Sequence, residues 1–256
     1  MIPVVLHHGL MGFGDVQAGP IKLSYFRRID RGILQRGHPL IVTRVHPTAG
    51  VATRARQLKE TILRQLDILG RPLDRVLVIA HSLGGLDARY MISKLGMDER
   101  VCALLTVTTP HRGSPYADWC LRHLGQRLRG LRLMHALGLD VQALGDLTTE
   151  SCRRFNADVL DSPNLRYFSV SASRPRHRVP PFAAHSHKVI FDAEGDNDSL
   201  VSVRSSTWAH HLGVWPADHW HTINHRPVIE VKNPTGDITP YYLQALDRIA
   251  EAGVEM

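Results

Sequence analysis

One segment constrains this chain more than any other: VLVIAHSLGGLDARY, residues 76–90. The aliphatic run Val76–Ala80 predicts a buried strand, and Gly84 to about Leu95 predicts a helix directly after it. Ser82 stands in the turn, with small residues two positions away on each side. Such a turn exposes a hydroxyl at a helix N-terminus, which favours developing negative charge. We therefore predict that Ser82 is a nucleophile; a second interpretation is that it only caps the helix beside a packing glycine.

The rest of the chain predicts the layered fold that such a turn requires. Apolar runs alternate with segments of helical spacing, and the runs are apolar on both faces, which is typical of a parallel sheet covered by helices. The expected strands are Ile2–Leu6, Pro39–Val45, Val76–Ala80, Val101–Val107, Leu165–Val170 and Lys188–Phe191. The expected helices are Tyr25–Arg36, Thr53–Leu69, Gly84 to about Leu95, and Tyr241–Glu251. Residues 7–20, which are rich in glycine, are expected to form a loop.

We expect a single α/β domain over residues 1–256, with a helical insertion over 116–160. Leucines at helical spacing alternate with arginines in Ala117–Leu147. This pattern predicts an amphipathic lid over the site, and the alternative is a helix pair packed permanently on the sheet. Within the insertion, Leu133, Met134, Leu137 and Leu139 are candidates to line an acyl pocket, although they fit a core equally well.

A serine hydroxyl needs a base to take its proton and an acid to orient that base. The segment FDAEGDNDSLVS holds Asp192, Glu194, Asp196 and Asp198 after an expected strand. We predict Asp198 as the orienting acid, because the apolar residues that follow it return the chain to the core and would bury its carboxylate. Asp196 is the alternative.

The candidate bases lie in WPADHWHTINH, which offers His219, His221 and His225. We choose His219, which gives the chain order serine, aspartate, histidine that is typical of hydrolases with this turn. His221 would face elsewhere, and the pair His210-His211 is expected at a surface or a helix end.

The segment HHGL after the first strand predicts an oxyanion hole. An acyl-transfer transition state carries an oxyanion, and fixed backbone N–H groups stabilise it. We expect these donors to be the N–H groups of Leu10 and Leu83, although an ordinary glycine-rich loop is the alternative reading of HHGL.

Composition limits the other function classes. The formal net charge is +7, but no nucleic-acid motif accompanies the scattered arginines, which leaves solubility or attraction to anionic lipid surfaces. The 16 histidines and Cys102, Cys120 and Cys152 show no metal-site spacing, so we expect no metal and no cofactor; an unassigned histidine metal site is the alternative. No apolar run is long enough to span a bilayer, and no signal peptide precedes the first strand, so a cytoplasmic location is expected; secretion is the alternative if a leader is missing from this sequence.

Together, VLHHGLMGFG, IAHSLGG, TTPHRGS, GDNDSLVSVRSS and ADHWHTINH resemble bacterial triacylglycerol lipases and esterases of the α/β-hydrolase superfamily. The resemblance spans nearly the whole chain and implies Ser82, Asp198 and His219 as the triad, with Arg112 in a structural role. Ala80 in place of the first glycine is similar to the small Bacillus lipases. His221 stands where the Pseudomonas-type group has a calcium-binding aspartate, so no calcium is expected there. The disulfide of part of the family is not evident.

These features predict a serine carboxylic-ester hydrolase, foremost a lipase that cleaves triacylglycerol-like esters through an acyl-enzyme, with substrate met at a lipid–water interface. The alternatives on the same triad are a short-chain esterase, a polyester hydrolase or an acyltransferase. A non-catalytic binding protein of the same fold is the most distant alternative.

Overall fold

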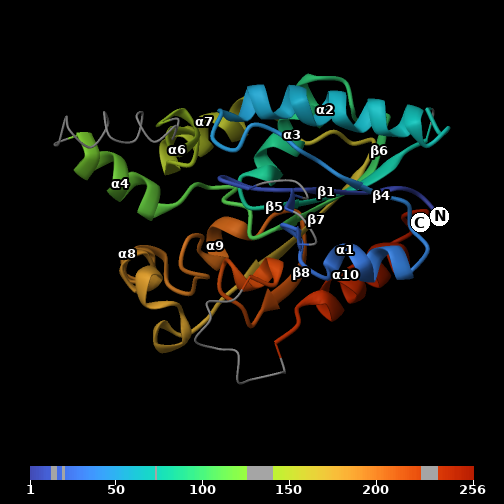
Figure 1. Cartoon of the computed structure of the whole chain (residues 1–256). Coiled ribbons are helices and arrows are strands. Elements are labelled where there is room, and N and C mark those ends of the chain that lie inside the picture. The colour runs from blue at the N-terminus through green and yellow to red at the C-terminus, as the bar shows by residue number, and fades with distance from the viewer. Residues whose placement is uncertain (13–15, 19–20, 73, 126–140, 226–235) are drawn as a thin grey trace.

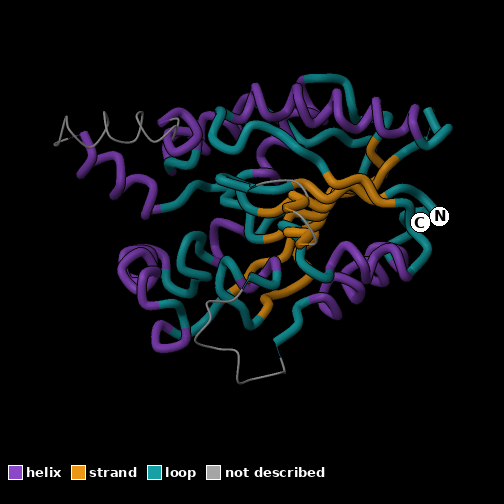
Figure 2. The backbone as a smooth tube through the Cα atoms, in the orientation of Figure 1, coloured by secondary structure: helices purple, strands orange, loops and turns teal. Residues whose placement is uncertain are grey.

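The computed structural model describes residues 1–12, 16–18, 21–72, 74–125, 141–225 and 236–256. Its centre is a six-stranded sheet in the order β4-β1-β5-β6-β7-β8, in which every pair is parallel. Figure 2 shows these strands between layers of helices. The strands are β1 (Val4–His7), β4 (Leu40–Val42), β5 (Val76–His81), β6 (Val101–Val107), β7 (Arg166–Ala172) and β8 (His210–Trp215).

Helices cover both faces of the sheet, as the sequence predicted (Figure 1). On one face lie α2 (Val51–Ile68) and α3 (Gly84–Lys94), and on the other lie α1 (Ile29–Gln35) and α10 (Thr239–Glu251). Successive residues of a strand point to opposite faces, and the strands here are apolar on both. Thus Val78 packs in the core beneath α2 and α3, whereas Leu77 and Ile79 belong to the core beneath α1 and α10.

The remaining helices gather at the carboxyl edge of the sheet, opposite the two chain termini (Figure 1). They are α4 (Pro115–Gly125), α6 (Val141–Asp146), α7 (Thr149–Asp158), α8 (Ala184–Glu194) and α9 (Val203–Ser206), with the short 3₁₀ turns η1 (Arg176–Arg178), η2 (Pro181–Ala183) and η3 (His221–Ile223). Ligands of open α/β sheets bind beyond the carboxyl ends of the strands. This end of the molecule therefore holds the site.

Two expectations were wrong. Lys188–Phe191 is part of helix α8 and not a strand, and the burial of Ile190 beside exposed Phe191 shows a one-sided helical pattern. The last strand is instead β8, an edge strand that begins at His210 and His211; of the two positions expected for this pair, exposed His210 fits the surface and neither residue lies at a helix end. Within the expected loop of residues 7–20, Val16–Ala18 (β2) pairs antiparallel with Ile21–Leu23 (β3).

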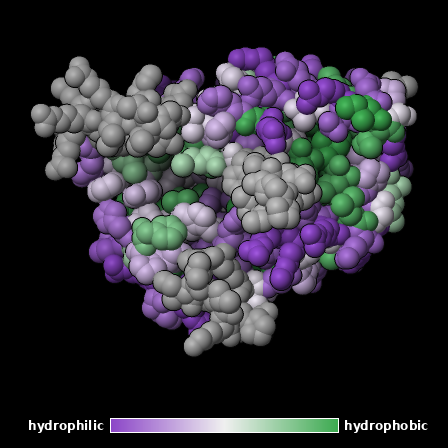
Figure 3. Space-filling view, viewed as in Figure 1, coloured by the Kyte–Doolittle hydropathy of each residue, from purple (hydrophilic) through white to green (hydrophobic). Residues whose placement is uncertain are grey.

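Among the described residues, no helix combines the length and apolar character that crossing a bilayer requires. The space-filling view shows a largely hydrophilic face whose hydrophobic residues gather mainly near the end of α2 (Figure 3). All three cysteines are free.

Candidate active site

Ser82 occupies the tight turn between β5 and α3. Its φ of 55° lies in the left-handed region, which a non-glycine residue adopts at an energetic cost, typically at a functional turn. Two glycines permit this geometry. A Cβ at Gly9 would lie 2.8 Å from the Ser82 Cβ, and one at Gly84 would lie 2.8 Å from the His8 carbonyl oxygen. The close approach that the sequence predicted around Ser82 is therefore present.

Three side chains from distant parts of the chain form one hydrogen-bonded row. The Ser82 Oγ lies 3.0 Å from His219 Nε2, and His219 Nδ1 lies 2.7 Å from Asp198 Oδ2. Because a carboxylate only accepts, Nδ1 carries the proton and Nε2 is left to accept from the serine. Asp198 and His219 are buried, and Ser82 is 8% exposed. This arrangement is the geometry of a serine nucleophile with its base and orienting acid.

The loops that carry Asp198 and His219 are fixed by hydrogen bonds. Asp198 Oδ1 accepts from the N–H groups of Leu200 and Val201 at 2.9 and 2.7 Å, and the Asp198 carbonyl accepts from the His219 N–H at 2.8 Å. Asp218, next to His219, is buried and forms an ion pair of 2.8 Å with Arg174. The acid and the base therefore hold each other in register through their own backbones.

The two N–H groups expected to bind an oxyanion are available. Among the described residues, neither the Leu10 N–H nor the Leu83 N–H donates to an acceptor, and Leu10 lines the cavity above Ser82. The Gly9 carbonyl accepts from the Gly12 N–H and from Arg54 Nη2. In a trans peptide, the C=O and the next N–H point in opposite directions, so the Leu10 N–H points away from Arg54.

Arg54 stabilises this loop from beneath. It is fully buried, and its guanidinium donates to the carbonyl oxygens of His8 and His46 and to Asp87 Oδ2. Asp87 also lies 2.9 Å from His7 Nε2. The network joins α2, α3 and β1 directly under the predicted oxyanion loop. It fixes the loop's backbone against the turn that carries Ser82.

His81 packs beside His219. Its ring lies 4.7 Å from that of His219, and its two nitrogens contact Tyr25 Oη at 2.8 Å and Thr222 Oγ1 at 2.9 Å. Burial, with a further contribution from His219, holds the pKa of His81 well below its ordinary value. His81 therefore stays neutral beside His219 and leaves the proton chemistry to it.

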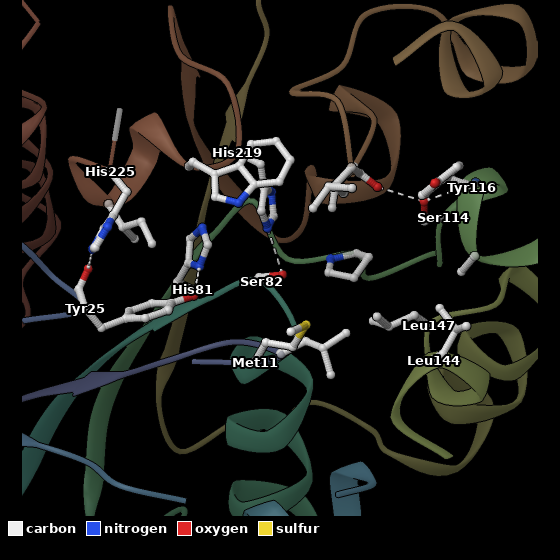
Figure 4. A pocket seen from close by; sticks show the side chains of 17 residues that line it. Met11, Tyr25, His81, Ser82, Ser114, Tyr116, Leu144, Leu147, His219 and His225 are labelled. Carbon is white, nitrogen blue, oxygen red and sulfur yellow. Dashed lines mark hydrogen bonds between the residues drawn. The ribbon is translucent and has the colours of Figure 1, made fainter. Parts of the chain in front are cut away.

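A cavity of about 440 Å³ opens over Ser82 and is mostly apolar. In Figure 4, Ser82 and His219 lie between two groups of side chains, with His81, Tyr25 and His225 on one side and Leu144, Leu147 and Tyr116 on the other. Further lining residues are Leu10, Met11, Pro110, Ala117, Leu200, Val201, Trp220 and Ile223. The leucine side, formed by α4 and α6, can hold an apolar chain next to the nucleophile.

The residues considered as alternative acid and base do not contact the Ser82–His219–Asp198 row. Asp196 is exposed, and His221 Nε2 lies 2.6 Å from the Gly236 carbonyl oxygen. His225 lines the cavity but contacts the carbonyl oxygens of Ser24 and Tyr25. Arg112 donates to the carbonyl oxygens of Arg204 and Thr207, in agreement with a structural role.

Part of the expected acyl pocket lies outside the described residues, namely Leu133, Met134, Leu137 and Leu139. The movement of a lid over 116–160 therefore stays a prediction. In the part of the chain that the structure describes, no cluster of three or more histidine, cysteine or acidic side chains could hold a metal. The expectation about calcium at His221 also stays a prediction.

Sequence reasoning missed the supporting residues Arg54, Asp87, Tyr25, Thr222 and Arg174. They are distant in the chain from the groups they hold, and single residues of these types carry no pattern. The sequence held one signal for Arg54 and Asp87. The pair His7-His8 stands at the end of an expected buried strand, and buried polar rings need hydrogen-bond partners.

Comparisons with known proteins find relatives that are named as lipases. A family profile described as a PGAP1-like alpha/beta domain matches residues 51–159. Triacylglycerol lipase 2 of Saccharomyces cerevisiae is 27% identical over 91% of this chain and 75% of its own length. A triacylglycerol lipase of Burkholderia plantarii is 31% identical over 46% of this chain, which is 32% of that protein's length.

A solved structure extends the likeness to the fold. The crystal structure of a metagenomic carboxyl esterase superposes with a TM-score of 0.77 at 20% identity, covering 98% of this chain and 76% of the other. At that identity, the likeness establishes the α/β-hydrolase fold, as the sequence resemblance implied.

Proposed function

We propose, from the premise that this chain is an α/β-hydrolase of the lipase and esterase type, that it cleaves lipid acyl esters through an acyl-enzyme on Ser82. The observation that carries the proposal is the continuous hydrogen-bonded row from Asp198 through His219 to Ser82, which opens onto an apolar cavity. The apolar side of the cavity, where Leu144 and Leu147 lie, favours a fatty acyl chain over a polar substrate.

In the first half of the reaction, Ser82 Oγ attacks the ester carbonyl carbon while His219 Nε2 takes its proton. The carbonyl oxygen becomes an oxyanion, which the N–H groups of Leu10 and Leu83 stabilise. Asp198 stabilises the imidazolium that forms. The bond to the alcohol oxygen then breaks as Nε2 returns the proton to that oxygen.

In the second half, water replaces the alcohol. His219 Nε2 takes a proton from the water as its oxygen attacks the acyl carbon, and the same oxyanion hole holds the second tetrahedral intermediate. Collapse of this intermediate breaks the bond to Ser82 Oγ, returns the proton to it, and releases the fatty acid.

The experiment is ester hydrolysis across a chain-length series of nitrophenyl esters and on emulsified triacylglycerol. We expect hydrolysis of long acyl chains and of the emulsion, and a fall of roughly 10⁴-fold or more in kcat for Ser82→Ala. Ser93→Ala, a half-buried serine further along α3, is the control and should keep full activity.

Two results would contradict the proposal. Substantial activity in Ser82→Ala, with the melting curve unchanged, would refute the nucleophile. Strong preference for acetyl esters, together with no activity on the emulsion, would leave a short-chain esterase.

A further inference from the structure

A second surface borders the active-site cavity and has no place in the reaction. Residues 173–191 contain four arginine or lysine residues, three histidines and no acidic residue. The structure folds this segment into η1, η2 and the first eight residues of α8, whose last turn adds Asp192 and Glu194; α8 packs against α4. A run of one charge sign beside a lipid-type cavity indicates a partner of opposite charge.

Two large apolar side chains stand exposed in the same segment. Phe182 is 68% exposed and Phe191 is 53% exposed. The visible surface over α8 is otherwise largely hydrophilic (Figure 3). Exposed phenylalanines among cations are typical of surfaces that enter a membrane interface.

Two of the cations stand outside the ion pairs of this segment. Arg176 and Arg178 are exposed, and neither forms an ion pair within the described part of the chain. Arg176 lines a depression of about 570 Å³ together with Lys188 and Phe191. Asp192 and Asp196 also line it, and Asp192 pairs with Lys188. The two arginines thus keep their charge free for an external anion.

Ring contacts connect this segment to the cavity mouth at two places. The Phe182 ring packs edge-on against Trp220 at 4.9 Å, and Trp220 lines the cavity over Ser82. His185 packs against Trp119 at 4.6 Å and Tyr116 at 6.2 Å, and Tyr116 also lines the cavity. A flat partner that covers the exposed segment would therefore lie next to the cavity mouth.

We propose that Arg176, Arg178, Phe182, Lys188 and Phe191, the basic aromatic surface, dock this protein on an anionic lipid bilayer. The two arginines meet lipid phosphates, Lys188 adds its side chain beside Phe191, and the two phenylalanine rings enter the interface. Docking in this way holds the mouth of the cavity at the membrane, where acyl esters reach Ser82 without crossing water. The inference rests on the proposed function for its purpose, but the surface is separate from the catalytic row.

The experiment measures sedimentation with vesicles, using Ser82→Ala protein so that lipid is not consumed. The vesicles are phosphatidylcholine alone or mixed with phosphatidylglycerol. We expect binding to the mixed vesicles and much weaker binding to phosphatidylcholine. Arg176→Gln with Arg178→Gln should weaken partition onto the mixed vesicles roughly 30-fold, because each cation near an anionic surface contributes about a five-fold factor.

Matched control variants distinguish binding by this surface from effects of net charge or of exposed hydrophobic side chains in general. Arg31→Gln with Arg64→Gln makes the same change in net charge on exposed positions of α1 and α2. Ile68→Ser matches Phe182→Ser, because Ile68 is also 68% exposed. We expect Phe182→Ser to weaken partition by roughly ten-fold or more, and both controls to stay within about two-fold of the parent.

The outcomes separate the inference from the proposed function. Equal binding to both vesicle types, or equal losses in the control variants, would overturn the docking surface. A protein with intact Ser82 that fails to hydrolyse any ester would refute the proposed function, whatever the vesicles show. The double arginine variant should keep full activity on a soluble short ester, and a large loss there would also contradict a docking role.

Discussion

The two halves of the catalytic row are held in different ways. Ser82 follows β5, in which every residue from Val76 to His81 is buried, and packed glycines press the neighbouring loop against it. Asp198 and His219 lie on irregular segments between and after the last two strands, where backbone hydrogen bonds and the Arg174–Asp218 pair fix them. Packing positions the nucleophile, whereas hydrogen bonds position the acid and the base.

This difference separates activity from stability. A change in the hydrogen-bonded half removes a specific contact and leaves the core intact, so it should reduce the rate more than the free energy of unfolding. A change in the packed half disturbs the core itself and should reduce both. Variants in each half test that separation.

Within the hydrogen-bonded half, the largest effect on the rate is expected from Asp198→Asn. The amide oxygen can still accept from the Leu200 and Val201 N–H groups, but the amide nitrogen then faces His219 Nδ1 as a donor. The imidazole would carry its proton on Nε2, where it cannot accept from Ser82. We expect kcat/KM to fall by about 10³ to 10⁴-fold, with a melting temperature close to that of the parent.

Asp196→Asn is the control for this prediction, because Asp196 is exposed and two residues earlier. It should leave both quantities unchanged. If Asp196→Asn reduced kcat/KM more than Asp198→Asn does, the assignment of Asp198 as the orienting acid would be wrong.

Arg54→Met tests the buried ion pair and hydrogen bonds that support the loop beside the packed half. It removes the donor to the carbonyl oxygens of His8 and Gly9 and leaves Asp87 buried without its arginine. Breaking a buried ion pair at one partner costs about 3–5 kcal/mol. We expect that loss in urea unfolding, together with reduced kcat because the Leu10 N–H is no longer held in place.

Arg56→Met, an exposed arginine on the same helix, should change neither stability nor rate. If Arg54→Met kept the parent's kcat at a temperature where it stays folded, Arg54 would have no positioning role for the oxyanion loop.

Ala80→Val should have a smaller effect. Ala80 is fully buried and belongs to the core beneath α2 and α3. Two added methyl groups overpack a dense core, at a cost of about 1–3 kcal/mol. We expect lower stability and lower activity together, because Ser82 is two residues away. Ala193→Val on the exposed surface of α8 is the comparison, and equal stability of the two variants would contradict a packing role for Ala80.

The sequence predicted most of what is local. Ser82 and its turn could be identified because the strand, the small residues and the helix are contiguous. Asp198 could be chosen from its few acidic neighbours because apolar residues follow it. His219 could be chosen from the nearby histidines because it follows Asp198 in the chain order typical of these hydrolases. Lys188–Phe191 was misassigned because four apolar-rich residues fit a strand and a helix equally well.

Other features could not be predicted from the chain. Arg54 contacts residues 33 and 46 positions away, and Asp87 contacts His7 at a separation of 80. Such pairs leave no periodic pattern in the sequence. Each side chain bonds to a carbonyl or carboxylate group that is close to it only in the folded chain.

The smallest expected effect is the pH dependence of the packed half. Burial lowers the pKa of His8 to about 3 from an ordinary 6.5, so below about pH 6.5 the unfolded chain binds more protons at this residue than the folded chain does. Stability from His8 is therefore fully present above that pH and is lost as the pH falls. We expect about 1 kcal/mol less unfolding free energy at about pH 6 than at about pH 7.5 from this residue. Urea titrations of the parent and His8→Asn measure it, and an equal pH slope in both would contradict the assignment.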